Sequence, residues 1–237
     1  MTESNMPAAL IIPAFNEEAV IGQMLDAIPT GLYRLIIVAV NGSTDRTAQV
    51  ARAHGATVVT QQARGYGRAC LAAIHALPAE IQIVVFMQAD HSELAFEATL
   101  LIGPIQRGEA DMVVGSRILG QAESGALLPH QKFGNKLATT LIRLFWRHAY
   151  TDLGPYRAIT TSKLQSLGMR DKNYGWTVEM QVRALQYGLR VLEVPVTSRL
   201  RQAGENKVSG NARASILAGA KILWVILQLL VSGRSSN

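Results

Sequence analysis

Short runs of consecutive apolar residues, each followed by a helix-like segment, are the feature that most constrains the fold of this chain. Such runs occupy residues 8–12, 35–40, 57–59 and 81–86. A strand that is apolar at every position is buried on both faces, whereas a strand with one solvated face alternates apolar and polar residues. The pattern therefore predicts an α/β fold with a mostly parallel central sheet flanked by helices.

Helical patterns fill the intervals between these strands. Asn16 stands where it can cap the first helix, and Gly55 and Gly188 follow two others as expected stops. A chain of 237 residues can bury a full core, and we expect one domain over residues 1–212 followed by a helical segment at 213–237. The expected helices are 17–28, 45–54, 68–76, 96–106, 135–148 and 176–187, with further strands at 111–115 and 189–194.

Charge and cysteine content limit the function classes. The net charge of +6 and the pI of about 9.7 indicate anionic partners, without choosing between nucleic acid, lipid headgroups and phosphorylated small molecules. Cys70 is the only cysteine, which excludes a disulfide framework and a multi-cysteine zinc site and fits a reducing compartment. The first residues carry no secretory pattern, so we expect a cytoplasmic protein.

Polar side chains follow the predicted strands, at the sheet edge where open α/β folds bind ligands. A preference for turns explains Asn41-Gly42-Ser43 as well as a ligand-binding role does. An acid such as Asp90 directly after a buried strand is harder to explain by a turn. Residues 65–67 lack the third glycine and the following acid of a dinucleotide-binding loop, which excludes that function. The strand-end residues are Asn16, Glu17, Asn41, Asp45, Arg64, Arg68, Gln88, Asp90, His91, Ser116 and Arg117.

These motifs resemble family 2 glycosyltransferases, specifically the branch of dolichyl- or polyprenyl-phosphate mannosyl- and glucosyltransferases. The similarity runs almost end to end. The resemblance implies a GT-A fold, a nucleotide-diphosphate sugar donor, Mg²⁺ or Mn²⁺, and inverting hexosyl transfer. The matching segments are residues 12–18 and 41–47, Gln88-Ala89-Asp90, residues 114–117, 151–157 and 176–180, and a basic loop with Arg201, Gly204 and Lys207.

The resemblance also implies roles for individual residues. Asp90, with the carbonyl oxygen of Gln88, would hold the metal. An anionic lipid-phosphate acceptor needs no general base and would be oriented by Arg117 and Lys132. A hydroxyl acceptor needs a base, for which Asp152 and Glu179 are the candidates, so the predicted catalytic residues are Asp90, Arg117, Asp152 and Glu179. The implied donor-binding residues are Pro13, Phe15, Asn16, Glu17, Asn41, Ser43, Asp45, Gly67, Gln88, Ala89, Arg201 and Lys207.

Three positions depart from the family pattern. Val40 and Asn41 stand where the family carries two acids, and Gln88 replaces the first acid of its Asp-x-Asp motif. An amide offers a hard cation an oxygen but no charge. The alternative reading is therefore a glycosyltransferase-fold protein that binds or regulates without efficient transfer. A nucleotidyltransferase is disfavoured because residues 13–17 hold no glycine-rich basic loop. A nucleic-acid binder is disfavoured too, because only the net charge suggests it and no recognition helix or aromatic RNA motif accompanies the basic residues.

The apolar run at residues 216–231 predicts a helix at the membrane interface. At about 1.5 Å rise per residue it falls short of the ~30 Å hydrocarbon core, and it contains Lys221. Lys221 and Gln228 share one polar stripe, with Lys221 and Trp224 expected at headgroup level. We predict peripheral attachment to the cytoplasmic face, with residues 137–145 as a second membrane-facing strip near Arg143. Burial of the helix against the domain is the alternative.

Overall fold

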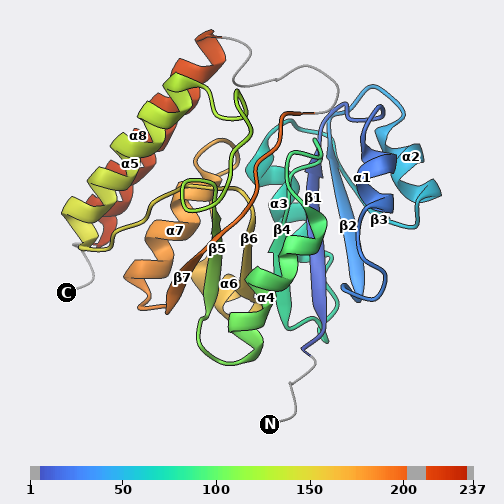
Figure 1. Cartoon of the computed structure of the whole chain (residues 1–237), viewed down its shortest axis with the longest axis horizontal. Helices are drawn as coiled ribbons and strands as arrows, with labels where there is room; N and C mark the ends of the chain where they lie inside the picture. The colour runs from blue at the N-terminus through green and yellow to red at the C-terminus, as the bar shows by residue number, and fades with distance from the viewer. Residues whose placement is uncertain (1–5, 202–211, 234–237) are drawn as a thin grey trace.

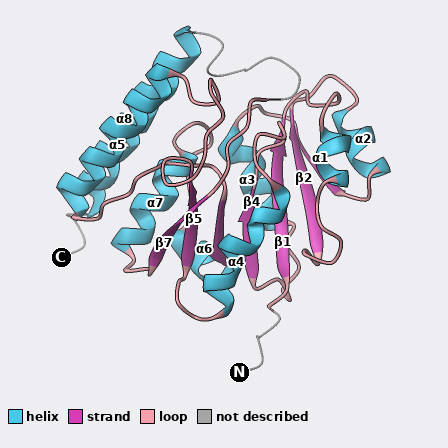
Figure 2. Ribbon diagram, viewed as in Figure 1, coloured by secondary structure: helices cyan, strands magenta, loops and turns pink. Residues whose placement is uncertain are grey.

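The computed structural model describes residues 6–201 and 212–233. For residues 212–216 and 233 it describes the backbone only. A seven-stranded sheet lies between layers of helices (Figures 1 and 2). The strand order is β3 (Thr57–Gln61), β2 (Leu35–Asn41), β1 (Ala8–Ala14), β4 (Ile83–Phe86), β6 (Arg157–Thr160), β5 (Met112–Ser116) and β7 (Val191–Pro195).

Neighbouring strands are parallel except at β6, which runs antiparallel to both β4 and β5. The predicted mostly parallel α/β sheet is therefore confirmed. Strand β6 was not predicted, because it is only four residues long and has Arg157 at one end and Thr160 at the other. Strand β4 is equally short but apolar throughout, whereas β6 has no continuous apolar run by which local hydrophobicity could identify it.

Helices cover both faces of the sheet (Figure 2). Ala9 and Ile11 of β1 belong to the core cluster shared with α3, α7 and α8, whereas Leu10 and Ile12 face the cluster shared with α1 and α4. This double burial is why β1 is apolar at every position. The helices are α1 (Ile21–Asp26), α2 (Thr47–Ala53), α3 (Tyr66–His75), η1 (Ala95–Glu97, a 3₁₀ turn), α4 (Ala98–Gln106), α5 (Pro129–Trp146), α6 (Thr161–Leu167), α7 (Trp176–Gln186) and α8 (Ala212–Gly233).

The prediction that Asn16 caps a helix starting at Glu17 is wrong. Asn16 has a positive φ of 52°, and its side-chain oxygen accepts a hydrogen bond from the Thr44 amide. The Asn16 amide donates in turn to the Ser43 hydroxyl. Asn16 therefore joins the loop after β1 to the loop after β2, and α1 begins only at Ile21.

Helix α8 lies alongside α5 and against α7 (Figure 1). Val225, Ile226 and Leu229 of α8 are buried in the core. Lys221 forms an ion pair with Asp171, with 2.9 Å between Nζ and Oδ2, so the prediction that Lys221 lies at headgroup level is wrong. Within residues 6–201 and 212–233, the structure has no helix long and apolar enough to cross a bilayer.

Candidate active site

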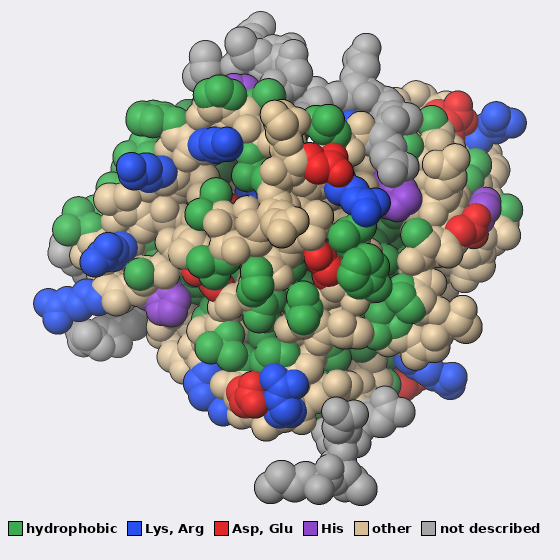
Figure 3. Space-filling view, in the orientation of Figure 1, with side chains coloured by type: hydrophobic (Ala, Val, Ile, Leu, Met, Phe, Trp, Pro, Cys, Tyr) green, Lys and Arg blue, Asp and Glu red, His purple; other side chains and the backbone are tan. Residues whose placement is uncertain are grey.

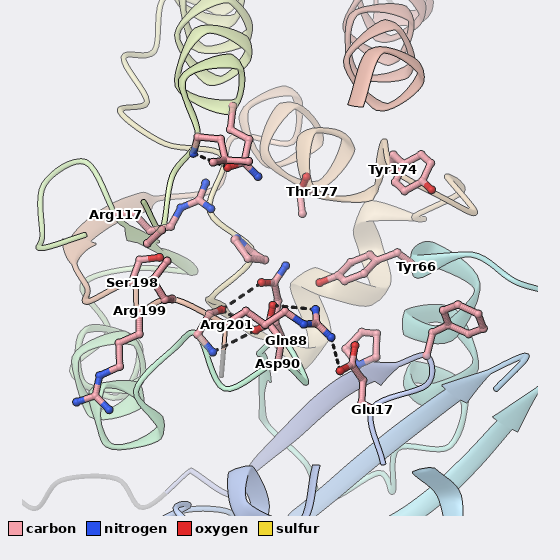
Figure 4. A pocket seen from close by; sticks show the side chains of 18 of the residues that line it. Glu17, Tyr66, Gln88, Asp90, Arg117, Tyr174, Thr177, Ser198, Arg199 and Arg201 are labelled. Carbon is pink, nitrogen blue, oxygen red and sulfur yellow. Dashed lines mark hydrogen bonds and ion pairs between the residues drawn. The ribbon is translucent and has the colours of Figure 1, made fainter. Parts of the chain in front are cut away.

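A cavity of about 770 Å³ opens beyond the carboxyl ends of β1, β2 and β4 (Figure 4). The sheet topology explains its position, because parallel neighbours end at the same edge and their loops meet there. The structure brings eight of the residues predicted for the site to the cavity wall. They are Pro13, Phe15, Glu17, Asn41, Gln88, Asp90, Arg117 and Arg201.

Oxygen atoms gather at one corner of the cavity. Asp90 Oδ1 accepts hydrogen bonds from the Ser92 amide, at 3.1 Å, and from the Ser92 hydroxyl, at 2.6 Å. The same hydroxyl lies 3.4 Å from the side-chain oxygen of Gln88. The two residues predicted to hold a metal thus present their oxygens to one point, with Ser92 as a third oxygen that the sequence did not single out.

The guanidinium of Arg201 lies at this corner between two carboxylates. It donates to Glu17, and its Nη1 is 3.5 Å from Asp90 Oδ2 (Figure 4). Oxygen ligands and carboxylate charge are what a hard divalent cation requires, so these residues fit the divalent metal that the sequence resemblance implies. In the described part of the chain no three His, Cys, Asp or Glu side chains form a metal cluster.

Asn41 supports the cavity near Phe15. Its side-chain oxygen accepts from the Gly65 amide and its Nδ2 donates to the Ala14 carbonyl, both at 3.3 Å. The amide thus ties the ends of β1 and β2 to the start of α3. Arg64 stacks on the Phe15 ring, 4.4 Å from the centroid, which makes this end of the cavity flat and cationic.

Five predicted donor-binding residues lie behind the wall. Asn16 and Ser43 bond to each other, and Asp45 accepts from the Thr47 amide at the start of α2. Ala89 is buried between Gln88 and Asp90. Gly67 allows the backbone of α3 to approach the 170–175 loop, because a Cβ at this position would lie 2.0 Å from the Asp171 carbonyl oxygen. These residues hold the loops that carry the cavity wall.

Arg117, which lines another part of the wall and is 23% exposed, forms an ion pair with the fully buried Asp152. The Arg117 amide, Nε and Nη2 donate to the carboxylate at 2.9, 2.7 and 2.8 Å. Burial lowers the pKa of Arg117, but the hydrogen bonds and charge of Asp152 outweigh it and raise that pKa above its ordinary value. Arg117 therefore stays cationic. Both oxygens of Asp152 are engaged, so its geometry is that of a positioning residue.

Glu179 is engaged in a similar way, away from the cavity wall. Its carboxylate accepts from the Arg170 and Asp171 amides, and Nε of Arg183 lies 2.8 Å from Oε1. Glu179 thus holds the loop between α6 and α7. Lys132 is exposed in the first turn of α5, next to Gln131, which does line the cavity. Lys207 lies outside the described residues.

Several wall residues were missed by sequence reasoning. The sequence could have pointed to Tyr66, because this residue stands between two glycines, Gly65 and Gly67, at the start of α3. Glu93 is buried and accepts from the Gln88 amide at 2.7 Å, so it fixes the backbone of the metal corner. Burial raises the pKa of Glu93 to about 8, with the Asp90 charge adding to the effect and the Gln88 amide opposing it. Glu93 itself lies behind the wall. Other missed residues that line the cavity include Asn173, Tyr174, Ser198 and Arg199.

The chain is similar to known glycosyltransferases in both sequence and structure. An uncharacterized glycosyltransferase of Mycobacterium tuberculosis is 37% identical over 210 residues, covering 88% of this chain and 93% of that protein. The dolichyl-phosphate hexose transferase of Haloferax volcanii is 31% identical over 227 residues, covering 93% and 94%. The undecaprenyl-phosphate mannosyltransferase of Micrococcus luteus is 27% identical over 220 residues, covering 86% and 88%.

Among solved structures, glucosyl-3-phosphoglycerate synthase of M. tuberculosis, crystallised with Mn²⁺, UDP and phosphoglyceric acid, shares the fold. The TM-score is 0.79 at 21% identity, covering 96% of this chain and 80% of that one. This likeness confirms the expected GT-A fold. The model of "Glycosyl transferase family 2" matches residues 9–168, which hold β1 to β6 and the Asp90 corner. The chain therefore belongs to glycosyl transferase family 2 and is a glycosyltransferase.

Proposed function

We propose that this glycosyltransferase moves a hexose, with inversion, from a nucleotide-diphosphate sugar to a polyprenyl phosphate at a membrane surface. One observation carries the choice of acceptor. Asp152 and Glu179, the two candidate bases, have both oxygens engaged by protein donors, while the cation Arg117 lines the cavity. Such a site suits an acceptor that is already anionic and needs an orienting cation rather than a base.

The relatives support the same acceptor and donor classes. Two of them are named for transfer to dolichyl phosphate or undecaprenyl phosphate. The solved structure of similar fold holds UDP with Mn²⁺. The cavity fits a donor of this kind, with a flat cationic end at Phe15 and Arg64 for the base and an oxygen-rich corner at Asp90 for the diphosphate.

The chemistry then follows from the placement of these groups. An acceptor phosphate oxygen, oriented by Arg117, attacks the anomeric carbon from the side opposite the diphosphate. A bond forms from the anomeric carbon to that oxygen, and the bond to the diphosphate breaks, which leaves the electron pair on the departing nucleotide. A divalent cation held by Asp90 and Gln88 would supply positive charge to the leaving group. Arg201 adds a second cation there, and fixed positions lower the barrier further.

An apolar surface on α5 and α8 supports attachment to the membrane. Phe133, Leu137 and Leu144 are exposed at spacings that place them on one side of α5. On the face shown in Figure 3, Lys and Arg side chains lie along the edge formed by α5, among hydrophobic ones. Helix α8 adds a second exposed apolar stripe, made of Leu217, Trp224, Leu227 and Val231. Apolar stripes beside basic residues suit the interface of an anionic bilayer.

The test is transfer from a panel of UDP- and GDP-hexoses to a polyprenyl phosphate, with and without Mn²⁺, followed by mass spectrometry. We expect a metal-dependent polyprenyl-phosphate hexose product with one donor, and none with the corresponding polyprenol. Transfer to the polyprenol at equal rate would overturn the choice of acceptor. Nucleotide binding without any transfer would favour a protein that only binds the donor.

A further inference from the structure

We propose that Lys221 of α8 is a positioning residue for donor binding, although it does not line the cavity. It acts through Asp171, which shapes the 170–175 loop between α6 and α7. Asn173 and Tyr174 of this loop line the cavity, and Figure 4 shows Tyr174 on one side of it. The inference rests on the proposed function in one respect only, namely that a nucleotide-sugar binds in this cavity.

A single buried carboxylate connects the loop to α8. Oδ1 of Asp171 accepts from the Asn173 amide at 2.7 Å and from the Gly175 amide at 3.0 Å. The Asp171 side chain is 5% exposed, and its other oxygen, Oδ2, is 2.9 Å from Lys221 Nζ. One oxygen therefore sets the turn that presents Asn173 and Tyr174, and the other oxygen fixes that turn to the C-terminal helix.

The loop has little room to move on the side of α3. The Lys172 carbonyl accepts from the Arg68 amide at 3.2 Å. A Cβ at Gly65 would lie 2.2 Å from that carbonyl oxygen, so the two backbones are in direct contact. Gly65 and Tyr66 also line the cavity. A shift of the loop would thus disturb two walls of the donor site together.

Helix α8 holds the loop with one face and exposes the other. Val225, one turn from Lys221, packs so closely that a Cβ on Gly175 would lie 2.6 Å from its Cγ2. On the opposite side Trp224 is 63% exposed and Leu227 is 50% exposed. The helix that supports the cavity wall therefore also carries the apolar stripe proposed for the membrane.

Removal of the ammonium group leaves a buried carboxylate without its cation. An unpaired buried charge is strongly unfavourable, so the loop would move to hydrate Asp171. This predicts that Lys221→Met weakens binding of UDP or GDP with Mn²⁺ by about tenfold in calorimetry. The donor KM should rise in parallel while kcat stays within about twofold, because the groups around the reacting atoms are unchanged.

Two further variants separate positioning from loss of structure. Lys221→Arg keeps the charge and should restore most of the affinity. Asp171→Asn in the Lys221→Met background removes the unpaired charge and should bind nucleotide more tightly than Lys221→Met alone. Gln228→Met, an exposed polar position on the same helix, is the matched control and should leave nucleotide affinity unchanged.

The outcomes distinguish this inference from the proposed function. Unchanged nucleotide affinity and donor KM in Lys221→Met would overturn the inference, and so would a fall in kcat alone. If Lys221→Met is too unstable to assay, the double variant decides. Because Lys221 acts through Asp171, nucleotide affinity equal to that of Asp171→Asn with Lys221 intact supports the link, and a different affinity overturns it. Failure of the unmodified protein to bind any nucleotide would instead remove the proposed function.

Discussion

Arg117 and Asp152 meet as a two-pronged ion pair, with Nε 2.7 Å from Oδ2 and Nη2 2.8 Å from Oδ1. Asp152 has no exposed surface, and its backbone carbonyl accepts from the side chain of Gln181. The carboxylate therefore sets the orientation of the guanidinium and leaves Arg117 as the group that meets the cavity.

Replacement of Asp152 by Asn tests this positioning role. One side-chain oxygen becomes an NH₂ group that cannot accept from Arg117, so the guanidinium loses its fixed direction. We expect kcat/KM for the acceptor to fall by about 10²-fold, mainly through the acceptor KM. The pH profile of kcat should keep its shape, because no proton is transferred to Asp152. Loss of a rising acid limb in that profile would identify Asp152 as a base instead.

Restoring the missing acid at the metal corner should strengthen the metal site. In Gln88→Asp a carboxylate replaces an amide oxygen 3.4 Å from the Ser92 hydroxyl. The concentration of Mn²⁺ that gives half-maximal transfer should fall on the order of tenfold, because added ligand charge raises affinity for hard cations. Gln62→Asp, at an exposed position, controls for the added charge. Equal Mn²⁺ dependence in all three proteins would count against a metal at this corner.

Arg201 should have opposite effects on metal affinity and on transfer. Its guanidinium lies between Glu17 and Asp90, so Arg201→Met removes a positive charge from between two neighbouring carboxylates. Mn²⁺ alone should then bind several-fold more tightly in calorimetry. Transfer should fall by about 10²-fold, because the leaving diphosphate loses a positive charge. Weaker Mn²⁺ binding in the variant would contradict the arrangement of charges described above.

Glu93 should make folding stability depend on pH. Its pKa is raised by burial to about 8 in the folded protein, against an ordinary value near 4.5. Between these values the folded state holds more protons than the unfolded state, so the free energy of unfolding falls as pH rises from about 4.5 to 8. Glu93→Gln should flatten this slope in metal-free protein, as measured by urea unfolding at several pH values. An unchanged slope would show that Glu93 titrates normally.

The apolar stripes of α5 and α8 should control vesicle binding without affecting nucleotide binding. A double variant, Trp224→Glu and Leu144→Glu, places charges on both stripes, at side chains that are mostly exposed. Cosedimentation with anionic vesicles should weaken at least about tenfold, because each large apolar side chain contributes about 1.5–3 kcal/mol when buried. Phe96→Glu, at an exposed apolar side chain on η1, is the control. Full vesicle binding by the double variant would exclude this surface.

Local sequence pattern was sufficient for most of the architecture. Continuous apolar runs identified β1, β2 and β4, and the rule that parallel strands end at one edge placed Asp90 and Arg117 at the same cavity. The pattern could not predict β6 or the loop function of Asn16. Both depend on partners distant in sequence, since β6 pairs with β4 and β5 and Asn16 bonds to the loop after β2.

The sequence by itself determined the parallel strands β1, β2 and β4, the family and the position of the acid after β4, because periodicity and strand-end chemistry are local properties of the chain. Only the tertiary structure decided what each charged group faces. Asp152 meets a guanidinium 35 positions away, Asp90 meets one 111 positions away, and Lys221 turns inward to Asp171 rather than outward to a headgroup. The physical reason is that the role of a carboxylate depends on the donors that surround its oxygens, and packing of distant segments supplies those donors.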